Sequence, residues 1–389
     1  MVTNDSFSDN SSVDGKVKKV LSLLNTEAQQ EAAASEGNNS MLTESGADLL
    51  RKREEEYRDP EKQWIRRWVW LQTAKSILRK KQEKGNTQKI RYLTLPAYHR
   101  IDVSLLLKEG LLEVTKSTEG KPEEIYVAAF EHEPTKFALM EPHMPHFKLF
   151  GCEDIEKVLT ERTNKYHSEL IGLFPFDVIN LDLTTSLTPM HEGPYSKTMA
   201  AIEKIFDIQS GFGIDWALFL TFRNVPDELE AEARKQLFDN LQKNLNDHPI
   251  VLEAFQRRYV NKNTVEELEE SDIKICTSQS IAKWLVDRAH SHKYKISSMK
   301  TFFYTRFNEG IPPYDIYKHV FELTPGDVNV AHIPTKDIPI QAWMIDGLKR
   351  CIDQHKCTDV EEQLLRLLNS APDKFDEIED EIDSLVRMI

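Results

Sequence analysis

Short apolar runs alternate with amphipathic helical patterns between residues 90 and 222, and this alternation constrains the fold more than any other feature. The runs that predict strands are Ile90–Leu95, Ile125–Phe130, Phe147–Phe150, Phe176–Leu181 and Asp215–Phe222. The patterns that predict helices are Ile101–Lys108, Pro134–Met140, Asp154–Thr163 and Lys197–Phe206. Strands that alternate with helices are typical of parallel βαβ units with helices on both faces of the sheet. The sequence therefore predicts an α/β fold built on a mostly parallel sheet.

The pattern changes after residue 223. A charged helical stretch over Pro226–Tyr259 and a helix over Ser278–His290 lead to two strand-like segments, Ile296–Phe307 and Tyr314–Leu323. The segment that joins them, residues 308–313, contains one glycine and two prolines, which favour a turn. We therefore expect an antiparallel hairpin at the end of the sheet.

The chain divides into four parts. Residues 1–58 are polar and lack apolar periodicity, which predicts a flexible N-terminal arm. Residues 59–89 contain a basic helix with several tryptophans, and residues 90–325 form the α/β domain. Residues 326–389 carry amphipathic helical patterns that predict a helical tail. Such a tail most often packs on its own domain, and docking of this C-terminal helix on a partner protein is the alternative.

The basic helix, expected from Asp59 to Gln82, concentrates positive charge in an acidic protein. The whole chain has a net charge of −14, yet Glu83 is the only acidic residue between Lys62 and Arg91. Overall charge argues against a protein that coats nucleic acid non-specifically, but a local contact remains open. The helix face is either an ordinary solvated surface or a surface that contacts nucleic-acid phosphates. The candidate phosphate contacts are Arg66, Arg67, Arg79 and Lys80.

Composition and motifs argue against several classes of protein. The four cysteines are scattered, the N-terminal residues lack a signal-peptide pattern, and the longest apolar runs fall far short of the ~20 residues that span a bilayer. We therefore expect a cytoplasmic protein without membrane attachment. A P-loop and a nucleophile elbow are both absent from the sequence. No metal site is predicted, because His143 and His146, like Cys351, His355 and Cys357, lack further ligands.

Acidic residues follow three of the predicted strands, at the positions where parallel sheets bind ligands. Glu131 ends the second strand, Glu153 and Asp154 follow the third, and Asp182 follows the fourth. A carboxylate at the end of the second strand can accept hydrogen bonds from both hydroxyls of a ribose, because it has two acceptor oxygens. Glu153 or Asp154 can bind an adenine amino group, and Asp182 an amine. The alternative is that these carboxylates merely cap the following helices.

This order of elements resembles the class I S-adenosylmethionine-dependent methyltransferases. The segment Phe176–Asp182, FDVINLD, resembles the fourth-strand motif of tRNA guanine-N2 dimethyltransferases, and the hairpin matches the family's last two strands. The resemblance implies a Rossmann-like sheet and S-adenosylmethionine as cofactor. Asn180 and Asp182 would face the transferred methyl group as catalytic residues. The implied cofactor contacts are Leu95, Pro96, Ala97, Glu131, His132 and Asp154.

Two departures from the family pattern leave the function open. The segment Leu95–Arg100 has no glycine, although the family's first loop is glycine-rich so that the backbone can approach the cofactor. After Asp182, Leu183–Thr185 replace the family's proline and aromatic residue. One hypothesis is a methyltransferase that acts on nucleic acid or within a nucleic-acid complex. The other is a catalytically inactive subunit that serves as a scaffold in a bacterial multiprotein system, such as a defence system.

Overall fold

The structure is a computed structural model. It describes residues 65–96, 100–115, 123–144, 146–183, 187, 197–224, 231–247, 249–258, 262–308 and 311–326. The predicted arm over residues 1–58 lies outside these residues. So do Ala97 and, apart from Gly326, the predicted tail.

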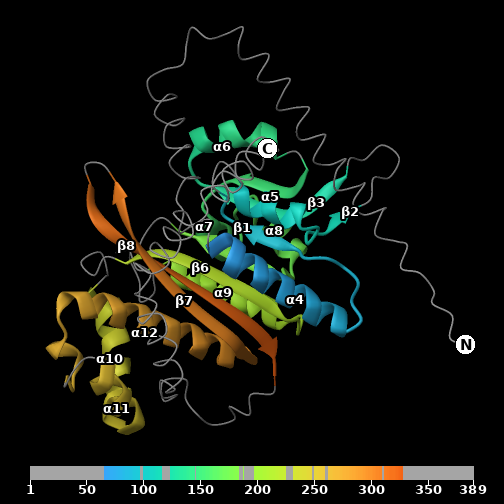
Figure 1. Ribbon diagram of the computed structural model, residues 1–389. Helices are drawn as coiled ribbons and strands as arrows, with labels where there is room; N and C mark the ends of the chain where they lie inside the picture. The colour runs from blue at the N-terminus through green and yellow to red at the C-terminus, as the bar shows by residue number, and fades with distance from the viewer. Residues whose placement is uncertain are drawn as a thin grey trace, which may run out of the picture.

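A single mixed sheet forms the centre of the protein (Figure 1). Its strands follow the order β2-β3-β1-β5-β6-β8-β7, and β4 also pairs with β3. The β4–β3, β3–β1, β1–β5 and β5–β6 pairs are parallel, whereas β8 runs antiparallel to both β6 and β7. The predicted α/β class and the terminal hairpin are therefore present. The strands are β1 (Tyr92–Thr94), β2 (Val114–Thr115), β3 (Glu124–Glu131), β4 (Phe147–Cys152), β5 (Val178–Asp182), β6 (Trp216–Asn224), β7 (Tyr294–Asn308) and β8 (Ile311–Pro325).

Helices cover both faces of the sheet (Figure 1). The α-helices are α4 (Leu71–Glu83), α5 (Ile101–Lys108), α6 (Pro134–Met140), α7 (Ile155–Thr160), α8 (His167–Leu173), α9 (Lys197–Ser210), α10 (Ala231–Asp247), α11 (Pro249–Arg258) and α12 (Glu270–Ser291). Among the described residues, three shorter helical segments are the π-helical turn η1 (Arg66–Trp70) and the 3₁₀ turns η2 (Glu141–His143) and η4 (Val265–Glu267). None of the helices in the described part of the chain combines the length and apolar character needed to cross a membrane.

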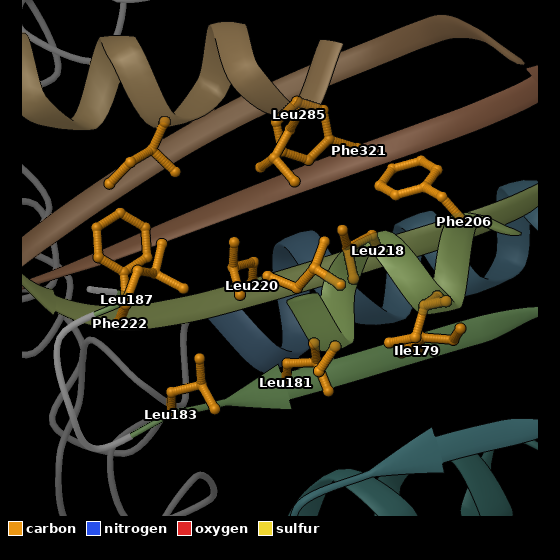
Figure 2. Close-up of a cluster of buried hydrophobic side chains, with 14 of the residues drawn as sticks. Ile179, Leu181, Leu183, Leu187, Phe206, Leu218, Leu220, Phe222, Leu285 and Phe321 are labelled. Carbon is orange, nitrogen blue, oxygen red and sulfur yellow. The ribbon is translucent and has the colours of Figure 1, made fainter. Parts of the chain in front are cut away.

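Side chains alternate between two hydrophobic cores, as the pleat of a strand requires. Ile179 and Leu218 face α7, α9 and α12 in the first core, which Figure 2 shows in close-up. Val178 and Phe219 face α4 and α5 in the second core. Because both faces of β5 and β6 are covered, their sequences read as nearly continuous apolar runs.

Helix α4 runs antiparallel to the parallel strands. Near its C-terminal end, Lys81 pairs with Asp177 at 2.8 Å and Lys84 pairs with Asp215 at 2.5 Å. Both acids lie just before the amino ends of β5 and β6. Toward the other end, Trp70 of η1 stacks on Phe219, with ring centroids 5.4 Å apart. The start of this helix therefore lies toward the carboxyl edge of the parallel strands.

Candidate functional site

The carboxyl ends of β3, β4 and β5 present the acids that the sequence singled out. Glu131 is the last residue of β3 and pairs in register with Cys152, the last residue of β4. Asp182 is the last residue of β5 and lies in one row with Thr221 of β6 and Lys318 of β8. Parallel pairing thus brings these acids to one edge of the sheet, as expected.

The carboxylate of Glu131 is held by its own loop. Its Oε1 atom accepts the backbone N–H of Glu133 at 2.8 Å and lies 3.3 Å from Nδ1 of His132. The side chain of Glu131 is 12% exposed, whereas that of His132 is 72% exposed. Both contacts fall on the same oxygen, so the geometry fixes the direction of the carboxylate at the sheet edge.

Asp154 occupies the N-cap position of α7 but makes no capping hydrogen bond with its side chain. Its carboxyl instead interacts with that of Glu156, whose Oε1 accepts the hydroxyl of Thr198 at 3.0 Å. Burial, followed by the hydrogen bond and charge of Asp154, raises the pKa of Glu156 to about 7. The capping alternative therefore does not describe Asp154, whose partner is a second acid.

A buried polar cluster joins β1, β5 and α5 beneath this edge. Oδ2 of Asp102 accepts the hydroxyl of Tyr92 at 2.6 Å, the hydroxyl of Thr94 at 3.0 Å and Nδ2 of Asn180 at 3.4 Å. Burial raises the pKa of Tyr92 well above its usual value, and the nearby charge of Asp102 adds to this effect. The cluster fixes the amide plane of Asn180, whose Oδ1 is buried and has no hydrogen-bond partner among the described residues.

Asp182 lies beside a buried cation that sequence reasoning missed. Nζ of Lys318 is 3.9 Å from Oδ1 of Asp182 and 4.9 Å from the ring centroid of Trp70. The side chain of Lys318 is 1% exposed and that of Asp182 is 16% exposed. Lys318 is distant in sequence, and the period-2 pattern of β8 does not reveal its partner. Asp102 was missed as well, although its position in the first turn of the helix after β1 was a usable signal.

The predicted basic surface is largely engaged within the protein. Arg66 is 5% exposed, and Lys80 donates to Glu322 at 2.8 Å and to Ser297 at 3.0 Å. Arg67 is half-buried. Arg79 is the exposed member of the predicted set, with 72% of its side chain accessible and an ion pair of 3.9 Å to Glu83. The four side chains therefore do not share one solvent-facing surface.

The described residues that flank the turn after β1 are hydrogen-bonded or buried. The N–H of Leu95 donates to the carbonyl of Asn180 at 3.2 Å, and Pro96 is buried. Arg100 is buried in the left-handed conformation, with φ of 47°. Burial lowers the pKa of its guanidinium to about 9. This left-handed position would suit a glycine, so the turn keeps an unusual backbone shape while carrying a large side chain.

Metal ligands do not gather in the described residues, where His, Cys, Asp and Glu side chains form no group of three suited to a metal ion. His146 instead contacts the carbonyl of Glu123 through Nδ1 at 3.1 Å.

Comparison with known proteins places the chain in a family. A crystal structure of the plantazolicin methyltransferase BamL, in complex with a triazolic desmethylPZN analog and SAH, is similar over 79% of this chain and 99% of that chain, at 8% identity and a TM-score of 0.28. A likeness at this level carries no argument about fold or function. No curated protein matches the sequence. The sequence profile of the PP_RS20740-like family matches residues 55–116 and 151–366, which is more than half of the chain. The chain belongs to the PP_RS20740-like family.

Proposed function

We propose that the chain binds S-adenosylmethionine at the carboxyl edge of β1, β3, β4 and β5 as a methyltransferase-type protein. The observation that carries the proposal is the placement of Glu131, Asp154 and Asp182 at the ends of successive parallel strands. The antiparallel β7–β8 hairpin that completes the sheet supports the same assignment. Ligands of open parallel sheets bind at this edge.

The polar groups at this edge fit those of the cofactor. Glu131, whose carboxylate is held by the N–H of Glu133, would accept the ribose hydroxyls, and Asp154, at the start of α7, would accept the adenine amino group. The buried, unpartnered Oδ1 of Asn180 is an acceptor that a bound ligand can satisfy. Leu95, Pro96, Ala97 and His132 complete the proposed contacts. Bound S-adenosylmethionine would supply an electrophilic methyl group, and Asn180 with Asp182 would orient the atom that accepts it.

A second candidate is a non-catalytic scaffold subunit, favoured by the turn after β1. Pro96 and Arg100 are both buried there, where a glycine-rich loop would leave room for a nucleoside. Leu183, which is also buried, follows Asp182 in place of a proline. A protein of this kind would keep the sheet and its surfaces without methyl transfer.

Nucleic acid as the target stays a prediction that depends mainly on Arg79. Arg66 is buried and Lys80 is bound to Glu322, so neither is available to a phosphate without rearrangement. Arg67 is half-buried and makes contacts of its own. The exposed lysines of α4 are also paired, as Lys75 is with Glu109 at 2.6 Å. A local contact through Arg79 would contribute one phosphate interaction.

Calorimetric titration with S-adenosylmethionine and S-adenosylhomocysteine tests the proposal. Glu131→Gln should weaken binding by at least about tenfold, because a hydrogen bond to a charged group contributes roughly 1.5–3 kcal/mol. Glu83→Gln is the matched control, since its exposed carboxylate lies at the far end of α4. Saturable binding that the first variant weakens and the second does not supports the proposal. Absence of binding at millimolar ligand would refute it and leave the scaffold candidate.

A further inference from the structure

We propose that Lys318 compensates the charge of Asp182 at the proposed transfer site, so that the site selects a neutral methyl acceptor over a cationic amine. Such an acceptor carries an N–H or O–H group, as amides, aromatic amines and hydroxyl compounds do at neutral pH. This inference rests on the proposed function, and it deepens that function by naming the class of acceptor.

The register of the sheet places Lys318 on the same face as Asp182. Asp182 of β5 pairs with Thr221 of β6, which pairs with Lys318 of β8. Residues that pair directly on neighbouring strands project their side chains to the same face of the sheet. Val320, two residues further along β8, packs in the second core with α4. The row that contains Lys318 therefore lies on the α4 side of the sheet, level with the carboxyl end of β5.

The ammonium group of Lys318 lies between a carboxylate and an aromatic ring. Its Nζ atom is 3.9 Å from Oδ1 of Asp182 and 4.9 Å from the ring centroid of Trp70. Trp70 is itself fixed by stacking on Phe219, with ring centroids 5.4 Å apart. Burial alone disfavours a charged lysine, whereas a nearby carboxylate and the face of an indole ring both favour the charged form. These contacts therefore favour an ion pair between Lys318 and Asp182.

The two members of this ion pair differ in their access to a ligand. The side chain of Asp182 is 16% exposed and that of Lys318 is 1% exposed. An acceptor at the end of β5 can therefore contact the carboxylate but not the ammonium group. A neutral N–H or O–H group can donate a hydrogen bond to this carboxylate. A cationic acceptor would bring a second positive charge close to Lys318, which weakens the attraction that Asp182 alone would exert.

Other buried charges on this side of the sheet act in the same direction. Arg66 of η1 and Arg100, at the start of α5, are buried cations, and Asp102 is a buried acid. The pKa of Arg100 is lowered by burial to about 9, which leaves its guanidinium charged at neutral pH. Arg66, Arg100 and Lys318 therefore outnumber Asp102 and Asp182 as buried charges. This balance disfavours a cationic acceptor.

The test compares S-adenosylmethionine, which carries a positive sulfonium, with S-adenosylhomocysteine, which carries a neutral thioether. Under the proposed function the sulfonium reports the charge at the transfer site, and calorimetric titration gives the ratio of the two dissociation constants. Lys318→Met removes the compensating cation, so we expect the preference for S-adenosylmethionine to rise by about 5- to 50-fold over that of the wild type. Asp182→Asn should lower the preference by a similar factor, and the double variant should have nearly the wild-type ratio.

Two further variants serve as controls. Thr221→Val is the matched control, because Thr221 is a buried residue in the same row and carries no charge, so the ratio should stay unchanged. Lys318→Arg keeps the positive charge and should also keep the wild-type ratio. If Lys318→Met does not fold, Asp182→Asn still measures the effect, because it changes the more accessible member of the pair.

The outcomes separate this inference from the proposed function. If Lys318→Met weakens both ligands equally, or weakens neither, Lys318 serves only the packing of β8, and the inference is wrong while the proposed function stands. A ratio that falls in Lys318→Met would show that Asp182 is not the anion that Lys318 compensates. If the wild-type protein binds neither ligand at millimolar concentration, the proposed function fails and this inference fails with it.

Discussion

Lys318 and Asp182 face each other across one row of the sheet, with Nζ and Oδ1 3.9 Å apart and Thr221 between them on β6. Lys318 comes from the last strand in the sequence, and Asp182 ends the strand that carries the proposed transfer site. Trp70 covers the lysine from the turn before α4. Three distant parts of the chain therefore meet at one buried charge.

The pair should be energetically coupled. We expect Lys318→Met and Asp182→Asn each to lower the free energy of unfolding, because each leaves a charge in a poorly solvated place. The double variant should lose less than the sum, with a coupling energy of about 0.5–3 kcal/mol. Urea unfolding of the wild type, both single variants and the double variant measures this cycle. Strictly additive losses would show that the two groups do not interact.

Glu156 should make the protein less stable as the pH rises. The folded-state pKa is raised to about 7, mainly by burial and then by Asp154, from a usual value of 4.5. The folded protein therefore binds an extra proton between these values, so stability is fully present below pH 4.5 and is lost as the pH rises through 7. The loss is on the order of 1–3 kcal/mol. Urea unfolding at pH 5 and pH 8 should show it in the wild type and not in Glu156→Gln. An equal pH dependence in both proteins would contradict the assignment.

His319 should have the opposite effect. It is fully buried next to Ser278, with Nε2 3.2 Å from the hydroxyl, and burial lowers its pKa from 6.5 to about 3. The neutral ring contributes stability above pH 6.5, and this contribution is lost as the pH falls toward 3, at roughly 1.4 kcal/mol per pH unit. His319→Gln should flatten the acid side of the stability curve. The exposed His132→Gln control should keep the wild-type slope.

Lys80 and Arg79 are neighbours on α4, but we expect reversal of their charges to have different effects on the free energy of unfolding. Lys80→Glu would place a carboxylate beside Glu322, which now accepts Nζ of Lys80 at 2.8 Å. We expect a loss of about 1–3 kcal/mol in the free energy of unfolding, because a partly buried pair becomes a like-charge contact. Arg79→Glu should change stability by less than about 0.5 kcal/mol, as exposed sites usually do. Thermal unfolding compares the two variants, and equal effects would contradict the described pairing.

Arg79→Glu also tests the nucleic-acid prediction without disturbing the fold. If Arg79 contacts a phosphate, the variant should bind duplex DNA more weakly and reduce the slope of log K against log salt by about 1. Titrations at two salt concentrations, with Glu83→Gln as a control for the local charge, measure this slope. Absence of binding by the wild type to both duplex DNA and RNA would remove nucleic acid from the function.

The apolar periodicity of the sequence predicted the positions of most helices and strands. Features that depend on contacts between residues distant in the sequence were not predicted. Ile101–Lys108 and Pro134–Met140 are helices with the predicted bounds, because both apolar pattern and flanking residues are local signals. The sequence predicts Arg66 on the polar face of a regular helix. The π-helical turn breaks the 3.6-residue period there, and Arg66 is buried.

The same difference applies to the residues of the candidate site, some of which local patterns predict and some of which depend on distant contacts. The rule that ligands bind at strand ends predicts a site at Glu131, Asp154 and Asp182, and the structure places the three residues at one edge of the sheet, while their role stays a prediction. Lys318 could not be found in this way, because its partner Asp182 lies 136 residues earlier (318 − 182) in the chain. The same holds for Lys80 and Glu322, which only the sheet order brings together.

The position of β8 between β6 and β7 also sets an order of assembly. This strand is the last of the sheet in the sequence, yet it lies inside the sheet and supplies Lys318 above Trp70 and Glu322 beside Lys80. Helix α4 leaves the ribosome early, but its full docking surface exists only after residue 325 has been made. Such sequence-distant contacts form slowly. In the newly made chain, α4 can therefore pair with Asp177 and Asp215 before β8 exists, whereas its contact with Glu322 forms only after β8 has been made.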